Sequence, residues 1–408
     1  MGEAIETPAE TGKTYALARW LPAVRVSGRP RPQTAVWEDG ITIGLTVFSL
    51  VALFWDGLRH NNLTGQDTFW SDAHIAMYSG LTLLGAWIAY VLIRRQDDVR
   101  HPDFSAVPLG YGLAIIALPL AAIAGPADGI WHSAYGFENQ IDSAYSPPHQ
   151  GLFIAGGLLA AIPFAAAWQR WGSTASLRAL FPAILSVTAV VAVGLFITHQ
   201  LVPFYAGVST TAAFQEDIEG RADAFSPGAD AVHEEGLSTA LTNYGDDAFP
   251  YYFYSTHHTV GGMLLFTAAL LGGILLARRR WRLPFGSLTI ICTFQALLWP
   301  MLSEYRQAEL IPALVLTGLV GDLLLARLAG ADGPVRVGAV RLFALVLPIV
   351  LWGLFFLCVE LFQGGLGWEP TLWFGVLVTS GALGYALSLL VFPPFSRAVE
   401  EPPPAPAS

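Results

Sequence analysis

The sequence predicts an all-α fold, a polytopic membrane helical bundle of about ten transmembrane helices arranged as helix pairs. The chain of 408 residues is 54% hydrophobic and only 13% charged, whereas soluble domains carry about 25% charged residues. Its apolar runs follow one another with short connectors, and each has the roughly 20 residues that a helix needs to cross a bilayer. Helices are expected rather than strands because lipid satisfies no backbone hydrogen bonds.

The predicted spans divide the chain into one membrane domain with two tails. Residues 1–38 are expected to form a polar cytoplasmic tail, 39–395 the transmembrane helical domain, and 396–408 a disordered C-terminal tail. Within the membrane domain, residues 203–254 are expected to form an acidic extracytoplasmic loop. The ten predicted helices cover residues 40–59, 73–95, 108–127, 149–169, 180–202, 255–277, 284–303, 308–329, 339–362 and 369–394.

Charged residues predict the orientation of the chain. All 21 Lys and Arg residues except Arg59, Arg221 and Arg306 fall on one side of the predicted membrane. Because basic loops stay in the cytoplasm, we expect both termini to be cytoplasmic in a multi-pass protein of the cell membrane. All nine histidines except His101 fall on the other side. A site built from histidine is therefore expected on the extracytoplasmic side, and the lipid bilayer, not nucleic acid, is the expected surrounding partner.

A motif is repeated in the first two outer connectors. Each contains Asp-Gly-x-x-His, then a polar stretch rich in aromatic residues, and then a His that opens the next helix. This pattern indicates an internal duplication, and repeated membrane folds commonly place sites between their repeats. The corresponding residues are Asp56, His60 and His74 in the first copy and Asp128, His132 and His149 in the second.

The spacing within each copy is typical of a metal site. Residues four apart on a helix share one face, so the Asp and first His can point at one atom while the second His closes the site. Two imidazoles and one carboxylate suit copper, zinc or non-haem iron and leave positions open for other ligands. Further candidate ligands are His199, His257 and His258. Carboxylates that could accept hydrogen bonds from the ligating imidazoles are Glu138, Asp142 and Asp72.

The second copy also resembles a known family. Asp128-x-x-Trp131-His132, a polar connector and Ser146-Pro-Pro-His149 are similar to the motif of the C subunit of particulate methane and ammonia monooxygenases, whose Asp and two His bind copper in the membrane. The resemblance implies that Asp128, His132 and His149 bind copper, with the first copy a more diverged set. The chain departs from the family in its longer connector, its doubled motif and its larger number of helices.

Three functions follow as alternatives. The resemblance favours a membrane protein that binds copper and acts as a monooxygenase-like oxidoreductase, or as a subunit of one, in which case a partner subunit or electron donor is needed. A protein that handles or transports copper without turnover is the second alternative. The third is a zinc-dependent membrane lipid hydrolase, for which Glu138 would be the general base. The sequence leaves open whether the chain is an enzyme and whether the two Asp/His/His sets form one site or two.

Overall fold

The computed structural model describes residues 25–62, 69–136, 141–208, 210–211, 249–328 and 336–393, and within these ranges the fold is all-α as predicted. Isolated bridges are the only strand-like pairings in these ranges. The α-helices are α1 (Val36–Asn62), α2 (Asp72–Ile93), α3 (Ala114–Tyr135), α4 (Ile141–Tyr145), α5 (Pro147–Ala160), α6 (Ile162–Arg170), α7 (Leu177–Phe196), α8 (Pro203–Ala206), α12 (Phe249–Arg280), α13 (Ser287–Met301), α14 (Ile311–Leu328), α15 (Val337–Phe362) and α16 (Pro370–Val391).

The described helices account for all ten predicted spans. Nine stretches in these ranges are long and apolar enough to cross a membrane, and the tenth prediction corresponds to the shorter apolar helix α13, of 15 residues. This helix begins after Gly286, whose φ is 94°, and is followed by Glu304 and Tyr305 with φ of 53° and 60°. Left-handed backbone at both flanks stops an L-residue helix, which explains why α13 is short.

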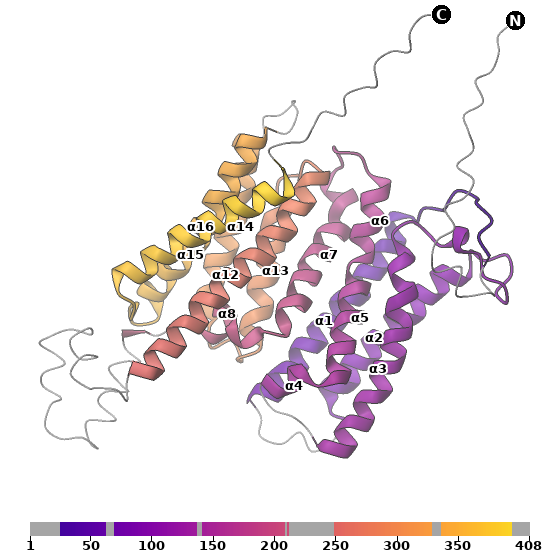
Figure 1. Ribbon diagram of the computed structural model, residues 1–408, viewed down its shortest axis with the longest axis horizontal. Coiled ribbons are helices and arrows are strands. Elements are labelled where there is room, and N and C mark those ends of the chain that lie inside the picture. Colours follow the sequence, from indigo (N-terminus) through magenta and orange to yellow (C-terminus); the bar gives the residue numbers. More distant parts are fainter. Residues whose placement is uncertain are drawn as a thin grey trace, which may run out of the picture.

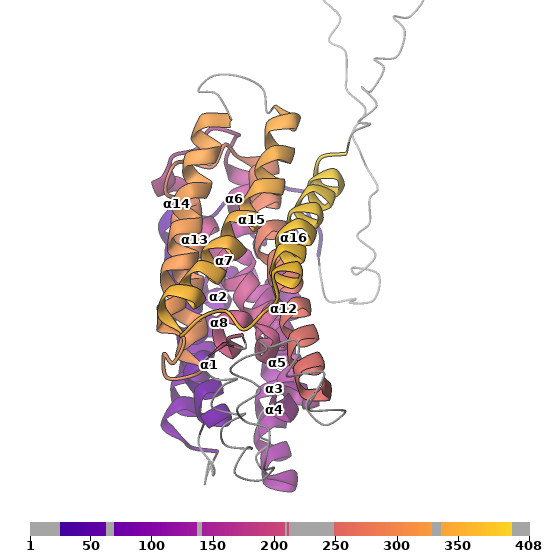
Figure 2. The ribbon, with the colours of Figure 1, turned by 90° about the vertical axis from the view of Figure 1, so that its left-hand side faces the viewer.

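Consecutive helices pack as antiparallel pairs around a central helix. α1 packs on α2, α3 on α5, α13 on α14, and α15 on α16. Figure 1 shows the N-terminal helices on one side of α7 and the C-terminal helices on the other. α7 contacts α1, α5, α6, α12 and α13, and its span is the most enclosed in the bundle. Seen from the side of α14–α16, the long helices run along one common direction (Figure 2).

The two ends of the bundle differ in their charges. At one end, Asp39 in the first turn of α1 pairs with Arg170 at 2.8 Å, and Glu38 pairs with Arg94 and with Arg95. The two carboxylates are buried, and that of Glu38 also accepts a hydrogen bond from the backbone N–H of Ala35 just before the helix. Acidic groups in the first turn stabilise a helix start, which agrees with α1 beginning at Val36, within the range predicted as tail. The helix thus begins three residues before the predicted boundary at residue 39. The opposite end holds the last turns of α1 and α3 and the first turns of α2 and α5.

Two predicted spans differ in detail from the structure. The third was expected to end at residue 127, but α3 continues to Tyr135, so that Asp128 and His132 are both helical. The fourth is divided into α5 and α6 at Ala161, because Pro163 at the start of α6 has no N–H for the helical ladder. Parts of the predicted tails and of the acidic loop, residues 1–24, 394–408 and 212–248, lie outside the described residues.

Candidate metal site

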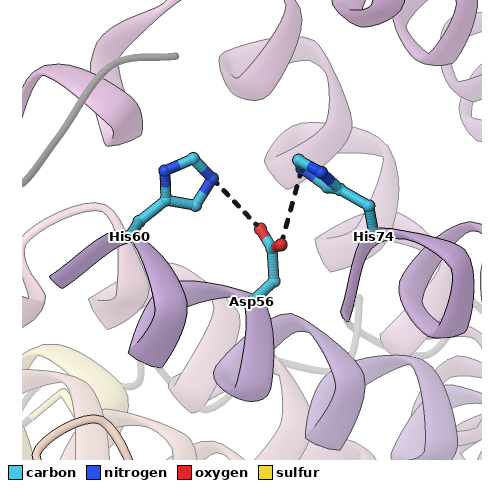
Figure 3. Close-up of side chains that lie close together, drawn as sticks. All are labelled: Asp56, His60 and His74. Atoms are coloured by element: carbon cyan, nitrogen blue, oxygen red, sulfur yellow. Dashed lines mark ion pairs between the residues drawn. The ribbon is translucent and has the colours of Figure 1, made fainter. Parts of the chain in front are cut away.

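The first copy of the motif forms a compact group at the junction of α1 and α2. Asp56 and His60 lie one turn apart near the end of α1, and His74 lies in the first turn of α2. The Oδ2 atom of Asp56 is 3.6 Å from Nε2 of His60, and its Oδ1 atom is 3.5 Å from Nε2 of His74. Figure 3 shows the two imidazoles on either side of the carboxylate.

The second copy repeats this arrangement on α3 and α5. The Oδ1 atom of Asp128 is 3.4 Å from Nε2 of His132 and 3.0 Å from Nε2 of His149. Each aspartate thus faces the His four residues later on its own helix and the His that opens the next helix. The duplication predicted from the sequence is therefore also a duplication of contacts.

Helix starts place the second histidine of each copy. Ser71 precedes α2 and Ser146 precedes α5, both in extended conformation, and each His is the third residue of its helix. The Ser71 hydroxyl accepts a hydrogen bond from the backbone N–H of His74, as expected of a serine cap. In α5, Pro147 and Pro148 occupy the first two positions, where their missing N–H groups leave no ladder bond unmade.

The two copies lie next to each other and share one histidine. His74 belongs with Asp56 and His60 and also with Asp128 and His132, and in each group the possible ligand atoms all lie within 4.8 Å of one another. The ring centroids of His74 and His132 are 5.7 Å apart. We refer to Asp56, His60, His74, Asp128, His132 and His149 as the Asp/His cluster. The packing of α2 near α3 brings the two copies together.

Backbone and tyrosine groups orient the second copy. Nδ1 of His132 donates to the carbonyl of Gly136 at 3.1 Å, and Nδ1 of His149 donates to the carbonyl of Ser143. Because a carbonyl only accepts, these bonds place the proton on Nδ1 and direct Nε2 of each ring at Asp128. The Tyr78 hydroxyl donates to Oδ2 of Asp128 at 2.6 Å. Histidines that bind a metal typically donate the N–H of the other ring nitrogen to a backbone or side-chain acceptor, which fixes the ring.

Aromatic neighbours of the cluster were not singled out from the sequence. Phe69 stacks on His74 with centroids 5.3 Å apart and planes at 28°, and Phe153 packs against His149 at 6.2 Å. Tyr78 and Phe153 each stand four residues after the His that opens their helix. This shared offset in "HIAMY" and "HQGLF" is the signal that could have found them.

The remaining predicted site residues lie apart from the six. His199 is buried beside the cluster, where its Nδ1 donates to the Phe196 carbonyl and its Nε2 faces Asn61 at 3.0 Å. Burial lowers the pKa of His199. His257 and His258 are exposed on α12 and belong to neither three-ligand group.

The three carboxylates predicted to orient the imidazoles have no described role in the site. Asp72 is exposed at the start of α2. Glu138 lies outside the described residues, as does the side chain of Asp142. In the described part of the chain, the orienting acceptors for His132 and His149 are backbone carbonyls, which no composition or spacing argument would have identified.

The chemistry of the donor set fits a metal ion. All six side chains of the Asp/His cluster are buried, and Asp128 is fully enclosed. Buried carboxylates are costly unless a cation or proton balances them. One divalent ion, or two monovalent ions, would neutralise the two aspartates, and imidazole nitrogen with carboxylate oxygen suits copper, zinc and iron.

Comparisons with known proteins were made for the whole chain. No family model matches it, and neither a curated protein nor a solved structure shows a significant match. The chain is thus a membrane-type helical protein with buried Asp/His groups that could hold a metal.

Proposed function

We propose that this chain is a membrane metalloprotein whose Asp/His cluster binds copper and that it acts as a monooxygenase-like oxidoreductase or as a subunit of one. The observation that carries the proposal is the convergence of four imidazoles and two carboxylates in one buried place. Nitrogen-rich sets of this kind bind copper(II) more tightly than other divalent first-row metals. The motif resemblance on Asp128, His132 and His149 supports the same metal.

The proposal requires an electron source. Both cysteines of the chain are buried in the helical core, and neither belongs to a three-ligand group, so they supply no thiolate at the cluster for electron transfer. A partner subunit or small reductant would have to deliver electrons to the cluster. The bound copper would supply the redox chemistry, while the chain holds its ligands and excludes water from them.

Replacement of His74 tests metal binding most directly, because His74 is shared by both three-ligand groups. In copper-loaded, detergent-purified protein, we expect His74→Ala to lose most of the bound copper, measured by elemental analysis and by the electron paramagnetic resonance of copper(II). The matched control is His101→Ala, because His101 also pairs with an aspartate, Asp98, at 2.7 Å but is exposed at the opposite end of the bundle. That variant should keep its copper.

Other outcomes separate the alternatives. An oxidoreductase should take up dioxygen when a reductant is present, and His74→Ala should lose this activity. Wild-type protein that binds copper but takes up no dioxygen would leave copper handling as the function. Zinc bound in place of copper would favour the hydrolase. Wild-type protein that takes up no metal would overturn the proposal and identify the cluster as a network of protonated histidines and aspartates.

A further inference from the structure

A cavity extends from the Asp/His cluster into the apolar part of the bundle. It lies among α1, α2, α5 and α7 and has an empty volume of about 900 Å³, part of it open to the surroundings. Asp56, His60 and His149 line one end of it. On α1 its lining runs from Thr46 to Asn61, which corresponds to about 22 Å of helix at 1.5 Å per residue. The cavity is therefore long, and its length follows the membrane-spanning direction.

The polarity of the walls changes along this length. Beside the cluster, His199 and Asn61 add polar groups to the three ligand side chains, whereas the walls farther along are formed by residues such as Leu50, Leu84 and Val193. Thr46 and Ser49 also line the deep part, but their hydroxyls donate to the carbonyls of Thr42 and Leu45 on their own helix. The deep part thus presents no free donor, and the lining contains no Lys or Arg.

The length of the cavity and the polarity of its walls limit the kind of molecule that can bind in it. A charged or strongly hydrogen-bonding molecule would leave its polar groups unpaired in the deep part, which is costly in an apolar environment. A flexible aliphatic chain needs no partner there, and it can reach such a cavity because it dissolves in the bilayer. Apolar pockets with a few polar groups at one end commonly fix the orientation of a ligand in this way.

We propose that the cavity binds a free, unbranched aliphatic molecule with one end of the chain held at the Asp/His cluster. The inference rests on the proposed function, since it names the substrate class of that site. The chain end nearest Asp56, His60 and His149 is the part that would meet a bound metal. The methylene groups farther along the molecule contact the leucine-rich walls between α1 and α2.

Gly156 on α5 offers a way to fill the cavity without disturbing the cluster. It lines the cavity, and a Cβ added there has no heavy atom within 4 Å. Gly156→Phe therefore places a large side chain into the space with no clash at its base. Gly194 on α7 also has open space at its Cβ but is exposed on the outer surface. Gly194→Phe is the matched control.

The experiment uses a photoreactive alkyl diazirine on the full-length protein in detergent, with labelled residues mapped by mass spectrometry. Wild type and Gly194→Phe should be labelled at cavity residues such as Leu50 and Leu84, and n-dodecane should suppress the labelling. Gly156→Phe should lose it. Equal labelling of all three proteins, or labelling restricted to lipid-facing residues, would overturn the inference. Displacement of the label by phosphatidylcholine but not by n-dodecane would identify a lipid acyl chain as the occupant and would also overturn it.

Copper content measured on the same samples separates this inference from the proposed function. If Gly156→Phe loses the cavity labelling of the wild type but the wild type binds no copper, the metal proposal is refuted and the aliphatic site stands. Copper binding unchanged in all three proteins, with no labelling of the cavity, would refute the aliphatic site alone.

Discussion

At the scale of single residues, Tyr78 joins the two copies of the motif. It lies on α2, one turn after His74 of the first copy, yet its hydroxyl donates to Asp128 of the second copy. The bond occupies one oxygen of Asp128 and leaves the other facing His132 and His149. A carboxylate held in this way keeps its orientation when a cation binds.

Loss of this hydroxyl should weaken metal binding without removing a ligand. We predict that Tyr78→Phe lowers the copper affinity of the cluster by about 10–100-fold, the range found when the partner of a metal ligand is removed. A titration against a copper chelator of known affinity measures the change. Tyr385→Phe, at a partly exposed position on α16, is the control. An affinity equal to that of the wild type would show that Asp128 needs no support from Tyr78.

At the scale of helices, a serine of α7 supplies hydrogen bonds to the backbone groups that the break between α5 and α6 leaves unpaired. In an uninterrupted helix the N–H of Phe164 would bond to the carbonyl of Ala160. Here the Ser186 hydroxyl of α7 donates to that carbonyl and accepts from the N–H of Phe164 at 3.3 Å. Side chains from adjacent helices commonly satisfy such freed backbone groups in membranes. The break is thus tied to the central helix.

Replacement of this serine should therefore destabilise the bundle. We predict that Ser186→Ala lowers the free energy of unfolding by about 1–3 kcal/mol, because it leaves a buried carbonyl and N–H without their hydroxyl partner. The control is Ser388→Ala on α16, since Ser388 is equally buried but its hydroxyl only supplements a carbonyl on its own helix. Denaturant titration in detergent compares the two. Equal losses of stability would show that the inserted hydroxyl has no special role.

At the scale of the whole molecule, the features that could be predicted from the sequence are those set by local residue patterns, such as helix positions and motif spacing. Apolar run length predicted the nine membrane-length helices and the shorter α13. The repeated motif predicted that each Asp would lie near two histidines, and the structure has these contacts. The sharing of His74 between the copies could not be predicted, because it depends on how α2 approaches α3. The bonds from His132 and His149 to backbone carbonyls were missed for a related reason, since every residue has a carbonyl and only the fold selects one.

The separation of charge between the two ends predicts how the bundle lies in the membrane. The end at which Arg170 and Arg95 pair with the first turn of α1 is the basic one, and basic helix ends stay in the cytoplasm. The Asp/His cluster lies at the other end, so we predict that it faces the extracytoplasmic side of the cell membrane. A substrate or metal ion would then reach it without crossing the cytoplasm.

Single cysteines introduced at the two ends test this orientation. Cys292 and Cys358 are both buried, so the native chain should react little with a membrane-impermeant maleimide. Glu369 lies in the exposed turn between α15 and α16 at the cluster end, and Thr174 lies in the exposed turn between α6 and α7 at the basic end. Glu369→Cys should react in intact cells, whereas Thr174→Cys should react only after permeabilisation. The reverse pattern would place the cluster in the cytoplasm, where a reducing environment would keep bound copper as copper(I) and the supply of metal would depend on cytoplasmic carriers.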